Sequence, residues 1–337
     1  MWRKIVLSVC FLLAATFCAS FCIVEKNRTL DGPLFYHHYI TYNVRTALRD
    51  QHTTRRMQEE RKNAPETLHD PYEGLANTEY QTVEWIGLAA AVDFAHSFEV
   101  TSAMIDLNEH GVYKLMNTSI SVDLDSYDLL RSSVSPTLRG PSGNPRFKTG
   151  ITALYFDPND LERLAETVRE PIVVENLIVN YTYDGQGRTE SVPIGKLVLY
   201  SADSNLERLS PNPVSDNLGL TGDGLGKNAA FSFVLQTLEG ASIQSVSLAC
   251  PKGLQAGFSV EVQQQNGRVR VHTSRSEDRW KEGLYYYQLD YIIQGTDSGG
   301  NPVTAVSDYQ NYSFCMMSTD EKAVWAELGH QREEENE

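Results

Sequence analysis

Cysteine is scarce in this 337-residue chain once its N-terminal apolar run is set aside. Three of the five cysteines lie in that run, which leaves only Cys250 and Cys315 for the remainder. The chain has no CxxC pair and no HExxH motif, which excludes two familiar zinc-site signatures. In an oxidising compartment Cys250 and Cys315 can form a disulfide. They can equally be two buried free thiols, because Cys250 continues the inward alternation of Val246 and Leu248.

Positive charge is also in short supply. The chain has 29 Lys and Arg against 44 Asp and Glu, a net charge of −15. Such a surface repels a phosphate backbone, so nucleic acid is excluded as a partner of the body of the protein. Residues 25–64 are the exception, with eight Lys and Arg against five Asp and Glu. A basic stretch near a membrane attracts anionic lipid, although a solvated helix face is the commoner explanation.

One long apolar run stands near the N-terminus. Ile5–Val24 is 20 residues without a charge, and as a helix it would span about 30 Å, the thickness of a bilayer's hydrocarbon core. A cleaved signal peptide would end its apolar stretch in small residues, as at Cys18–Ser20, but here the run continues to Val24. We therefore predict a transmembrane anchor after a short tail, residues 1–4. Arg3 and Lys4 favour a cytoplasmic tail, which places the bulk of the chain outside the cytoplasm.

Residues 25–79 are predicted to form a juxtamembrane helix and a polar connection. Apolar side chains recur every four positions, which gives one apolar face on a helix over about 34–62; they are Tyr36, Ile40, Val44 and Leu48. This face is a candidate for pairing with the first domain, with a second copy or with a partner helix.

The rest of the chain is predicted to be mainly β, in two strand-rich domains. Residues 80–203 show alternating strands, a helix near 158–169 that Asp157 can cap, and a hairpin turn at Asp184–Gly187. A Gly- and Pro-rich linker is predicted over 204–228. A second strand-rich domain, 229–317, contains the hairpin turn Asn266-Gly267. A short helix and an acidic tail, 318–337, complete the predicted order.

The second domain carries the one resemblance to a known family. Gly283–Tyr291, with the sequence GLYYYQLDY, and then Asp297–Asn301 resemble the last hairpin of bacterial immunoglobulin-like modules. The resemblance covers about residues 229–317 and implies a β-sandwich. That fold serves many binding, adhesive and structural proteins, so it does not name a function.

Three consecutive tyrosines mark the same stretch: Tyr285, Tyr286 and Tyr287. On a regular strand at least one of them faces outward, because successive side chains point to opposite faces. An outward ring can contact a protein or carbohydrate partner, or it can cover a cross-strand neighbour.

Three sequence motifs suggest a catalytic, phosphate-binding or metal-binding site, and each lacks residues that such a site needs. Asp297-Ser298-Gly299-Gly300 resembles the nucleophile region of chymotrypsin-type proteases, but His96 lacks the neighbours expected of the base, and the same residues favour a turn. Gly222–Lys227 lacks the spacing of a phosphate-binding loop. His37 and His38 would diverge by about 100° on a helix and could not easily share an ion.

Asp123, Asp125 and Asp128 offer oxygen ligands for Ca²⁺, but the alternation puts Asp123 and Asp125 on an outer face where carboxylates are normally solvated. The sequence therefore predicts no catalytic residue, no cofactor and no metal site.

The leading hypothesis is a non-enzymatic, membrane-anchored protein of the cell envelope, whose extracytoplasmic domains bind or organise a partner. An anchored hydrolase with dispersed carboxylates is one alternative, and it requires carboxylates that converge in a cleft with shifted pKa values. An accessory or sensory subunit is another, and it requires the face formed by Tyr36, Ile40, Val44 and Leu48 to stay uncovered in the monomer. The binding hypothesis requires an exposed aromatic or apolar patch on a strand face.

Overall fold

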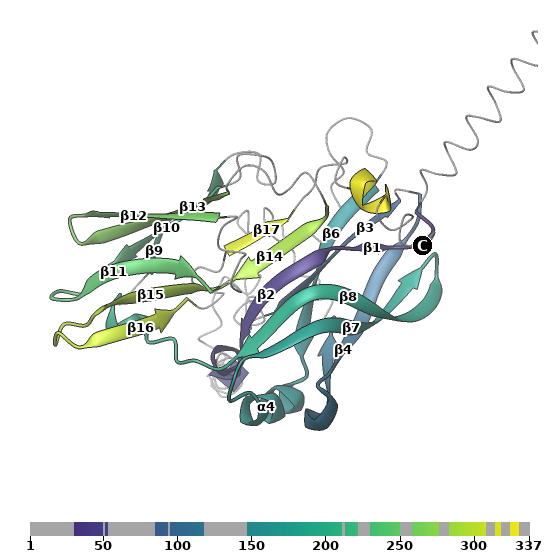
Figure 1. Ribbon diagram of the computed structural model, residues 1–337, viewed down its shortest axis with the longest axis horizontal. Coiled ribbons are helices and arrows are strands. Elements are labelled where there is room, and N and C mark those ends of the chain that lie inside the picture. Colours follow the sequence, from purple (N-terminus) through teal and green to yellow (C-terminus); the bar gives the residue numbers. More distant parts are fainter. Residues whose placement is uncertain are drawn as a thin grey trace, which may run out of the picture.

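The computed structural model describes residues 30–49, 51–52, 85–93, 95–117, 147–210, 213–221, 230–249, 258–275, 283–307, 314–317 and 324–329. These residues are mainly β-strand, as predicted (Figure 1). Short helical stretches accompany the strands, the longest being the ten residues of α4 (Pro158–Thr167). Across the described ranges, no helix is both long and apolar enough to cross a membrane. The predicted anchor Ile5–Val24 lies outside the described residues.

A ten-stranded sheet forms the N-terminal unit, in the order β1-β3-β6-β5-β4-β7-β8-β2-β14-β17. Its strands are β1 (Leu34–Phe35), β2 (His37–Asn43), β3 (Ile86–Asp93), β4 (Phe98–Asp106), β5 (Val112–Met116), β6 (Phe147–Phe156), β7 (Ile172–Tyr183), β8 (Gln186–Tyr200), β14 (Tyr285–Leu289) and β17 (Phe314–Met317).

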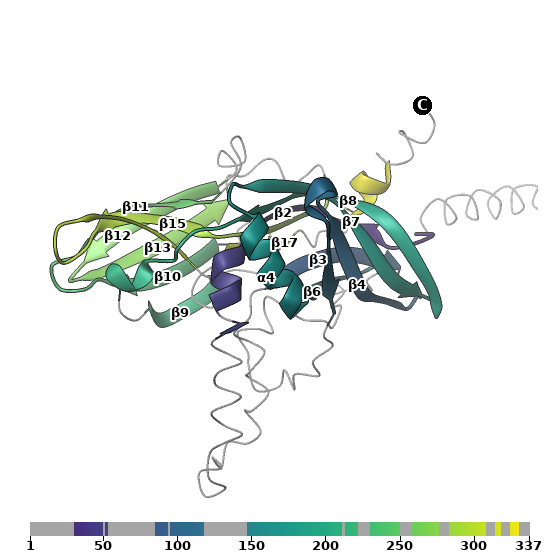
Figure 2. The same ribbon diagram turned by 90° about the horizontal axis from the view of Figure 1, so that it is seen from below.

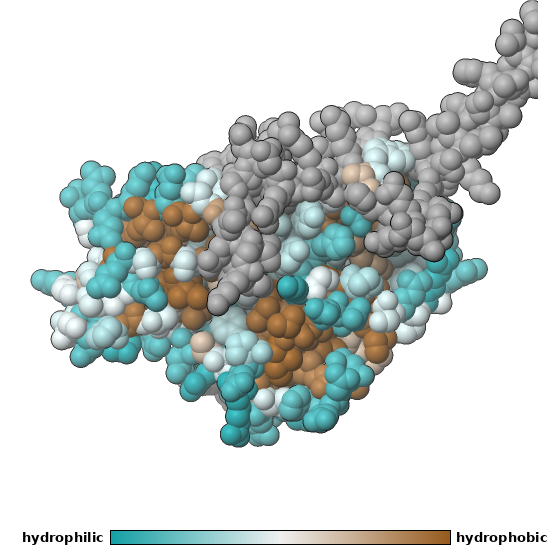
Figure 3. All heavy atoms as spheres, in the orientation of Figure 1, coloured by the Kyte–Doolittle hydropathy of each residue, from teal (hydrophilic) through white to brown (hydrophobic). Residues whose placement is uncertain are grey.

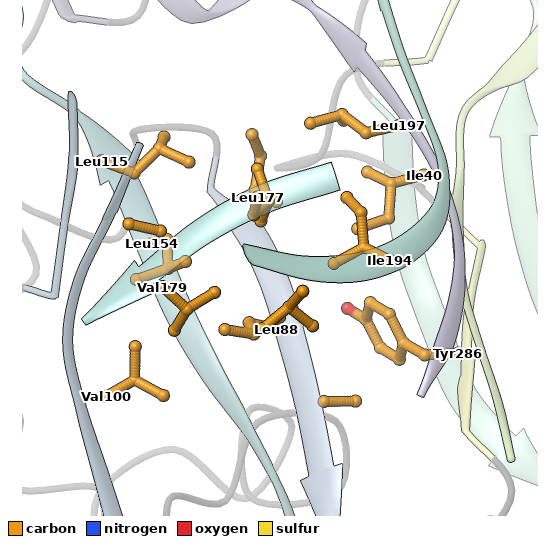
Figure 4. Close-up of a cluster of buried hydrophobic side chains, with 14 of the residues drawn as sticks. Ile40, Leu88, Val100, Leu115, Leu154, Leu177, Val179, Ile194, Leu197 and Tyr286 are labelled. Carbon is orange, nitrogen blue, oxygen red and sulfur yellow. The ribbon is translucent and has the colours of Figure 1, made fainter. Parts of the chain in front are cut away.

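This sheet curls so that β3, next to one end, faces β2 and β14 near the other, because β1 and β2 are consecutive parts of one chain segment. β1 pairs with β3 near one end of the sheet, whereas β2 pairs in parallel with β8 near the other. Between them, the Tyr36 N–H donates to the Ala89 carbonyl at 3.2 Å. Side chains from strands around the curl point toward one another and fill its interior (Figure 4).

The helix predicted over 34–62 is wrong for residues 34–43, which form β1 and β2. Only 44–49 and 51–52 are helical among the described residues of this range. A spacing of four satisfies both the helical period and the two-residue period of a strand. Tyr36, Ile40 and Val44 are therefore all buried in the N-terminal core, and Leu48 packs against it, so this face is already covered within the monomer.

The helix predicted near 158–169 is confirmed as α4. The Asp157 carboxylate accepts the Asn159 N–H at 3.0 Å, and Pro158 begins the first turn, where a missing N–H costs nothing. Helix 44–49 lies beside α4 (Figure 2), and the pair His52–Glu162, at 3.7 Å, joins their surfaces. Leu161 and Leu164 of α4 are buried in the same core as Val44.

The second unit is a β-sandwich of two sheets, as predicted. One sheet has the order β12-β13-β10-β9 and the other β11-β15-β16. Lettered in chain order from A to G, these sheets read DEBA and CFG, the strand order of an immunoglobulin constant-type domain. The strands are β9 (Pro213–Thr221), β10 (Ala230–Gln236), β11 (Ser242–Leu248), β12 (Phe258–Gln265), β13 (Arg268–Arg275), β15 (Tyr291–Thr296) and β16 (Pro302–Val306).

Two predicted boundaries of this unit change. Residues 213–221, assigned to the linker, form β9 and pair with β10; a strand that begins with proline is tolerated there because β9 is the last strand in its sheet. The stretch from Tyr285 to Thr296, assigned to the second domain, divides at Asp290 into two strands. Its first part, β14, joins the N-terminal sheet, and its second part, β15, belongs to the sandwich.

Two local predictions are confirmed. Asn266 and Gly267 both have positive φ, at 52° and 72°, and connect β12 to β13 as a two-residue hairpin turn. A short helix, 324–329, lies in the predicted tail, where the Trp325 ring meets Phe147 at 5.1 Å. Cys315 is in β17, but Cys250 lies outside the described residues, so the disulfide stays a prediction.

Candidate functional site

The two units share the segment formed by β14 and β15, and we call β2, β14 and the residues around Asp290 the junction. β14 pairs with β2 in parallel, in the register Tyr286 opposite His38 and Tyr287 opposite Tyr39. Alternation gives the junction two faces. His38, Tyr286 and Gln288 point into the N-terminal unit, whereas Tyr39, Tyr285 and Tyr287 lie on the other face.

The inward face meets β3 through side chains, and we call this contact the seam. The His38 Nε2 accepts the Ala89 N–H at 2.8 Å. The Gln288 Oε1 accepts the Gly87 N–H at 3.0 Å, and its Nε2 donates to the Trp85 carbonyl at 2.6 Å. These side chains satisfy backbone groups of β3 that would otherwise be buried without partners.

The His38 ring is held neutral in this position. It is fully buried, and burial lowers its pKa from 6.5 to about 3. The positive charge of the neighbouring His37 lowers the pKa further, while the carbonyls of Tyr36 and Ile194 act in the opposite direction. Because Nε2 accepts a hydrogen bond, the proton of the neutral ring is on Nδ1, which has no hydrogen-bond partner of normal geometry.

Gly87 lets the Tyr286 ring reach the seam. A Cβ at residue 87 would lie 2.2 Å from the Tyr286 Oη and 2.6 Å from its Cζ, closer than atoms can approach. With glycine there, the Tyr286 hydroxyl donates to the Gln288 Oε1 at 3.1 Å. The seam therefore depends on a residue without a side chain at this point.

Asp290 ties the two units together from inside the protein. It is 3% exposed, and its Oδ2 accepts the Thr41 hydroxyl at 3.1 Å and the Tyr200 hydroxyl at 2.5 Å. Its backbone carbonyl accepts the Ala249 N–H of the sandwich at 2.7 Å. Asp290 is thus hydrogen-bonded both to β2 and β8 of the N-terminal unit and to the residue that follows β11 of the sandwich.

The three predicted contact tyrosines occupy different environments. Tyr286 and Tyr287 are buried, at 0% and 7% exposure, so the prediction that they contact a partner is wrong for both; Tyr285 is half-buried. The Tyr39 and Tyr287 rings stack at 5.2 Å between centroids, and Phe258 of the sandwich meets Tyr287 at 5.0 Å. Covering a cross-strand neighbour, the second interpretation of these tyrosines, is therefore what the structure shows.

His96 has a partner that the sequence did not indicate. Its Nδ1 lies 2.6 Å from the Asp184 Oδ2, across 88 residues of chain. The Ser97 hydroxyl lies 3.5 Å from the other oxygen of Asp184, so serine and histidine share the carboxylate. A catalytic triad needs the serine on the second nitrogen of the histidine instead, so this arrangement is not a triad. The pKa of Asp184 is lowered, first by the Ser97 N–H and then by His96.

The protease-like sequence Asp297–Gly300 is a turn between β15 and β16. The Asp297 Oδ1 accepts the N–H groups of Gly299 and Asn301 at 3.0 and 2.9 Å, and Arg208 binds its Oδ2 at 2.5 Å. The Asn301 N–H and then Arg208 lower the pKa of Asp297 to about 2. Turn formation, the alternative to catalysis, explains these residues.

We expect this turn to give the protein an acid-dependent component of stability. Because the pKa of Asp297 is lowered by folding, its contribution is present above the ordinary value of 3.8 and is lost as pH falls toward 2. Asp297→Asn should lower the melting temperature at pH 6 and leave it nearly unchanged at pH 2. Scanning calorimetry across this range checks the prediction, with Ser298→Ala in the same turn as the control that keeps the wild-type profile.

Other candidate ligands do not form a metal site where the structure describes them. His37 and His38 lie on opposite faces of β2, one exposed and one buried. Across the described part of the chain, no group of three or more His, Cys, Asp or Glu is placed to hold a metal ion. The calcium candidates Asp123, Asp125 and Asp128 and the loop Gly222–Lys227 lie outside the described residues.

An apolar area lies on the outer face of the N-terminal sheet, over the region of β7 and β8 (Figure 3). Val173 is 52% exposed and pairs directly with the half-buried Val198 of β8. On the same face, half-buried Ile178 pairs with half-buried Met104 of β4. We call these four residues the outer patch.

No known family model and no curated protein sequence matches this chain. Similar solved structures include the zebrafish RET cadherin-like domains 1 to 4 (10% identity, 66% of this chain and 41% of that chain, TM-score 0.21). A chicken TCR is also similar, with 8% identity, 66% of this chain and 92% of that chain covered, and a TM-score of 0.19. The C-terminal domain of the Streptococcus agalactiae AgI/II polypeptide BspA has 9% identity, with 70% of this chain and 93% of that chain covered and a TM-score of 0.13. The chain spans about two fifths of the zebrafish chain. These TM-scores are too low to support an argument, so the fold assignment rests on the strand order of the sandwich.

Proposed function

We propose that this protein is a non-enzymatic, membrane-anchored, extracytoplasmic binding protein of the cell envelope, which presents the outer patch to a protein partner. The observation that carries the proposal is the exposure of Val173 on the outer face of β7, beside Val198. A strand face exposed to water normally carries polar side chains, and contiguous apolar surface there marks an interaction site.

The buried hydrogen bonds of the body support the same function. The buried hydrogen bonds of Asp290 hold both units, and the seam satisfies the edge of β3 with buried side chains. A surface built on hydrogen-bonded strands keeps its shape, so less free energy is lost in ordering it when a partner binds. The outer patch lies on such strands, β4, β7 and β8.

No contact among the described residues supports the hydrolase hypothesis or the subunit hypothesis. The hydrolase requires convergent carboxylates. Among the described residues the two with lowered pKa values, Asp184 and Asp297, each accept backbone N–H groups and lie in different units. The subunit hypothesis requires an uncovered helix face, and Tyr36, Ile40 and Val44 are in the core.

Photo-crosslinking on intact cells tests the proposal. A photoreactive amino acid in place of Val173 should give a discrete covalent adduct with another protein, because the side chain at this position faces outward. The same amino acid in place of Glu261, an exposed residue on β12, is the control and should give none. Absence of an adduct at Val173, or equal yields of adduct at Val173 and Glu261, would contradict the proposal that the outer patch binds a protein partner.

The location is tested separately with a membrane-impermeant amine reagent on intact and lysed cells. Lys114 and Lys196 are exposed lysines of the N-terminal unit and should react in intact cells. Their modification only after lysis would place the body inside the cell and contradict the extracytoplasmic assignment.

A further inference from the structure

We propose that the seam is an acid-operated latch: a proton on His38 breaks it and releases β3 from β2 and β14, while the sandwich stays folded. The proposal is independent of the outer patch, and it rests on the geometry of three side chains and two strand edges.

Protonation would reverse the chemistry of the hydrogen bond that closes the seam. In the neutral ring, Nε2 is an acceptor and receives the Ala89 N–H at 2.8 Å. A proton on Nε2 makes it a donor, so that two N–H groups would face each other inside a buried site. The seam loses its hydrogen bond and gains an unpaired charge, which is costly where water is excluded.

The groups around the ring supply no compensating negative charge. From β2, the charge of the neighbouring His37 lowers the pKa of His38, and the carboxylate of Glu327 lies 3.3 Å from the His37 ring rather than at His38. From β14, the Tyr286 ring meets the His38 ring at 5.5 Å, and Gln288 is uncharged. β8 presents the Ile194 carbonyl and β3 presents the Ala89 N–H. The carbonyls of Tyr36 and Ile194 therefore offset the effect of burial only in part, and among these groups no carboxylate faces the ring.

The seam is also the weaker of the two edges of β3. β3 pairs with β6 through eight residue pairs but with β1 through only two. Beyond those two pairs, the edge of β3 facing β2 and β14 is satisfied by the Tyr36 N–H and by the side chains of His38 and Gln288. Local opening follows the boundary with the fewest backbone hydrogen bonds, so β3 separates here before it leaves β6.

Hydrogen exchange on the full-length chain at pH 7.0, 5.5 and 4.5 tests the latch. In the opened seam His38 titrates near its ordinary value, so at pH 4.5 opening is favoured up to about 100-fold relative to pH 7. The protection of the Gly87 and Ala89 amides, corrected for the pH dependence of the intrinsic exchange rate, should therefore fall at least about tenfold between pH 7.0 and pH 4.5. This threshold is set below the maximum of about 100-fold. The amides of Phe233 and Val271, in the β10–β13 ladder, should keep theirs.

Two variants separate the latch from general acid damage. His38→Gln keeps an acceptor oxygen but cannot titrate in this range, and it should abolish the loss of protection at Gly87 and Ala89. His37→Gln replaces the neighbouring exposed histidine, whose charge only modulates the pKa of His38, and should still lose protection at Gly87 and Ala89 in acid. Loss of protection in β3 and the sandwich together, or an unchanged response in His38→Gln, would overturn the proposal.

If His38→Gln does not fold, nitrogen NMR of the wild-type histidines tests the latch instead, by following the protonation of His38 as the pH is lowered. The midpoint of His38 protonation must then coincide with the midpoint of β3 opening. Two separate midpoints would rule out the latch.

Discussion

Replacing Gln288 with leucine should cost about 2–6 kcal/mol of folding free energy, since it leaves two buried backbone groups unpaired at about 1–3 kcal/mol each. These are the Gly87 N–H and the Trp85 carbonyl, which Gln288 bonds at 3.0 and 2.6 Å. Leucine has a similar volume, so the loss reports the hydrogen bonds rather than a cavity. Urea unfolding of the full chain, followed by circular dichroism, measures the change.

Gln294→Leu is the matched control for this measurement. Gln294 lies in β15, close to Gln288 in the chain, but it is exposed and accepts the Ser245 hydroxyl at 3.1 Å. An exposed substitution of this kind should change stability by no more than about 0.5 kcal/mol. If the two variants lose similar amounts, Gln288 does not carry the seam.

Replacing Asp290 with alanine should uncouple the two units. The change removes the acceptor of the Thr41 and Tyr200 hydroxyls in a buried site. A buried hydroxyl left without its acceptor costs about 1–3 kcal/mol, so the expected loss is about 2–6 kcal/mol. Because Asp290 lies where β14 passes into β15, calorimetry should show one transition for the wild type and two for Asp290→Ala.

Asp290→Asn is the control that separates the hydrogen bonds from the charge. Asparagine keeps one acceptor oxygen of nearly the same shape, so the variant should retain a single transition with a smaller loss of stability. A single, unshifted transition in Asp290→Ala would show that the junction is held by its other contacts.

The seam and the junction could not be found from the sequence. The partners of His38, Gln288 and Asp290 lie 51, 201 and 249 residues away along the chain. No local pattern reports such distances, and buried polar residues look like surface residues when the chain is read alone. The tyrosine run Tyr285–Tyr287 drew attention to β14, the strand that carries Tyr286 and Gln288. It did so as a possible partner contact, however, and not as part of the seam.

The sequence by itself determined the elements whose causes are local. The Asp157-Pro158 start of α4 and the alternation in the sandwich strands follow from neighbouring residues. So do the hairpin turns at Asn266-Gly267 and at Asp184-Gly185, the first half of the predicted Asp184–Gly187. A cap, a turn residue with positive φ and a two-residue period act within a few positions. They are therefore visible before any fold is known.

Only the tertiary structure decided which strands pair. The spacing of Tyr36, Ile40 and Val44 fits a helix and a strand equally, and β8 and β14 on either side of β2 resolved it. Likewise, Tyr285–Leu289 has the same alternation whichever sheet it joins. Strand pairing depends on partners far along the chain, and strand propensity is set mainly by burial against those partners.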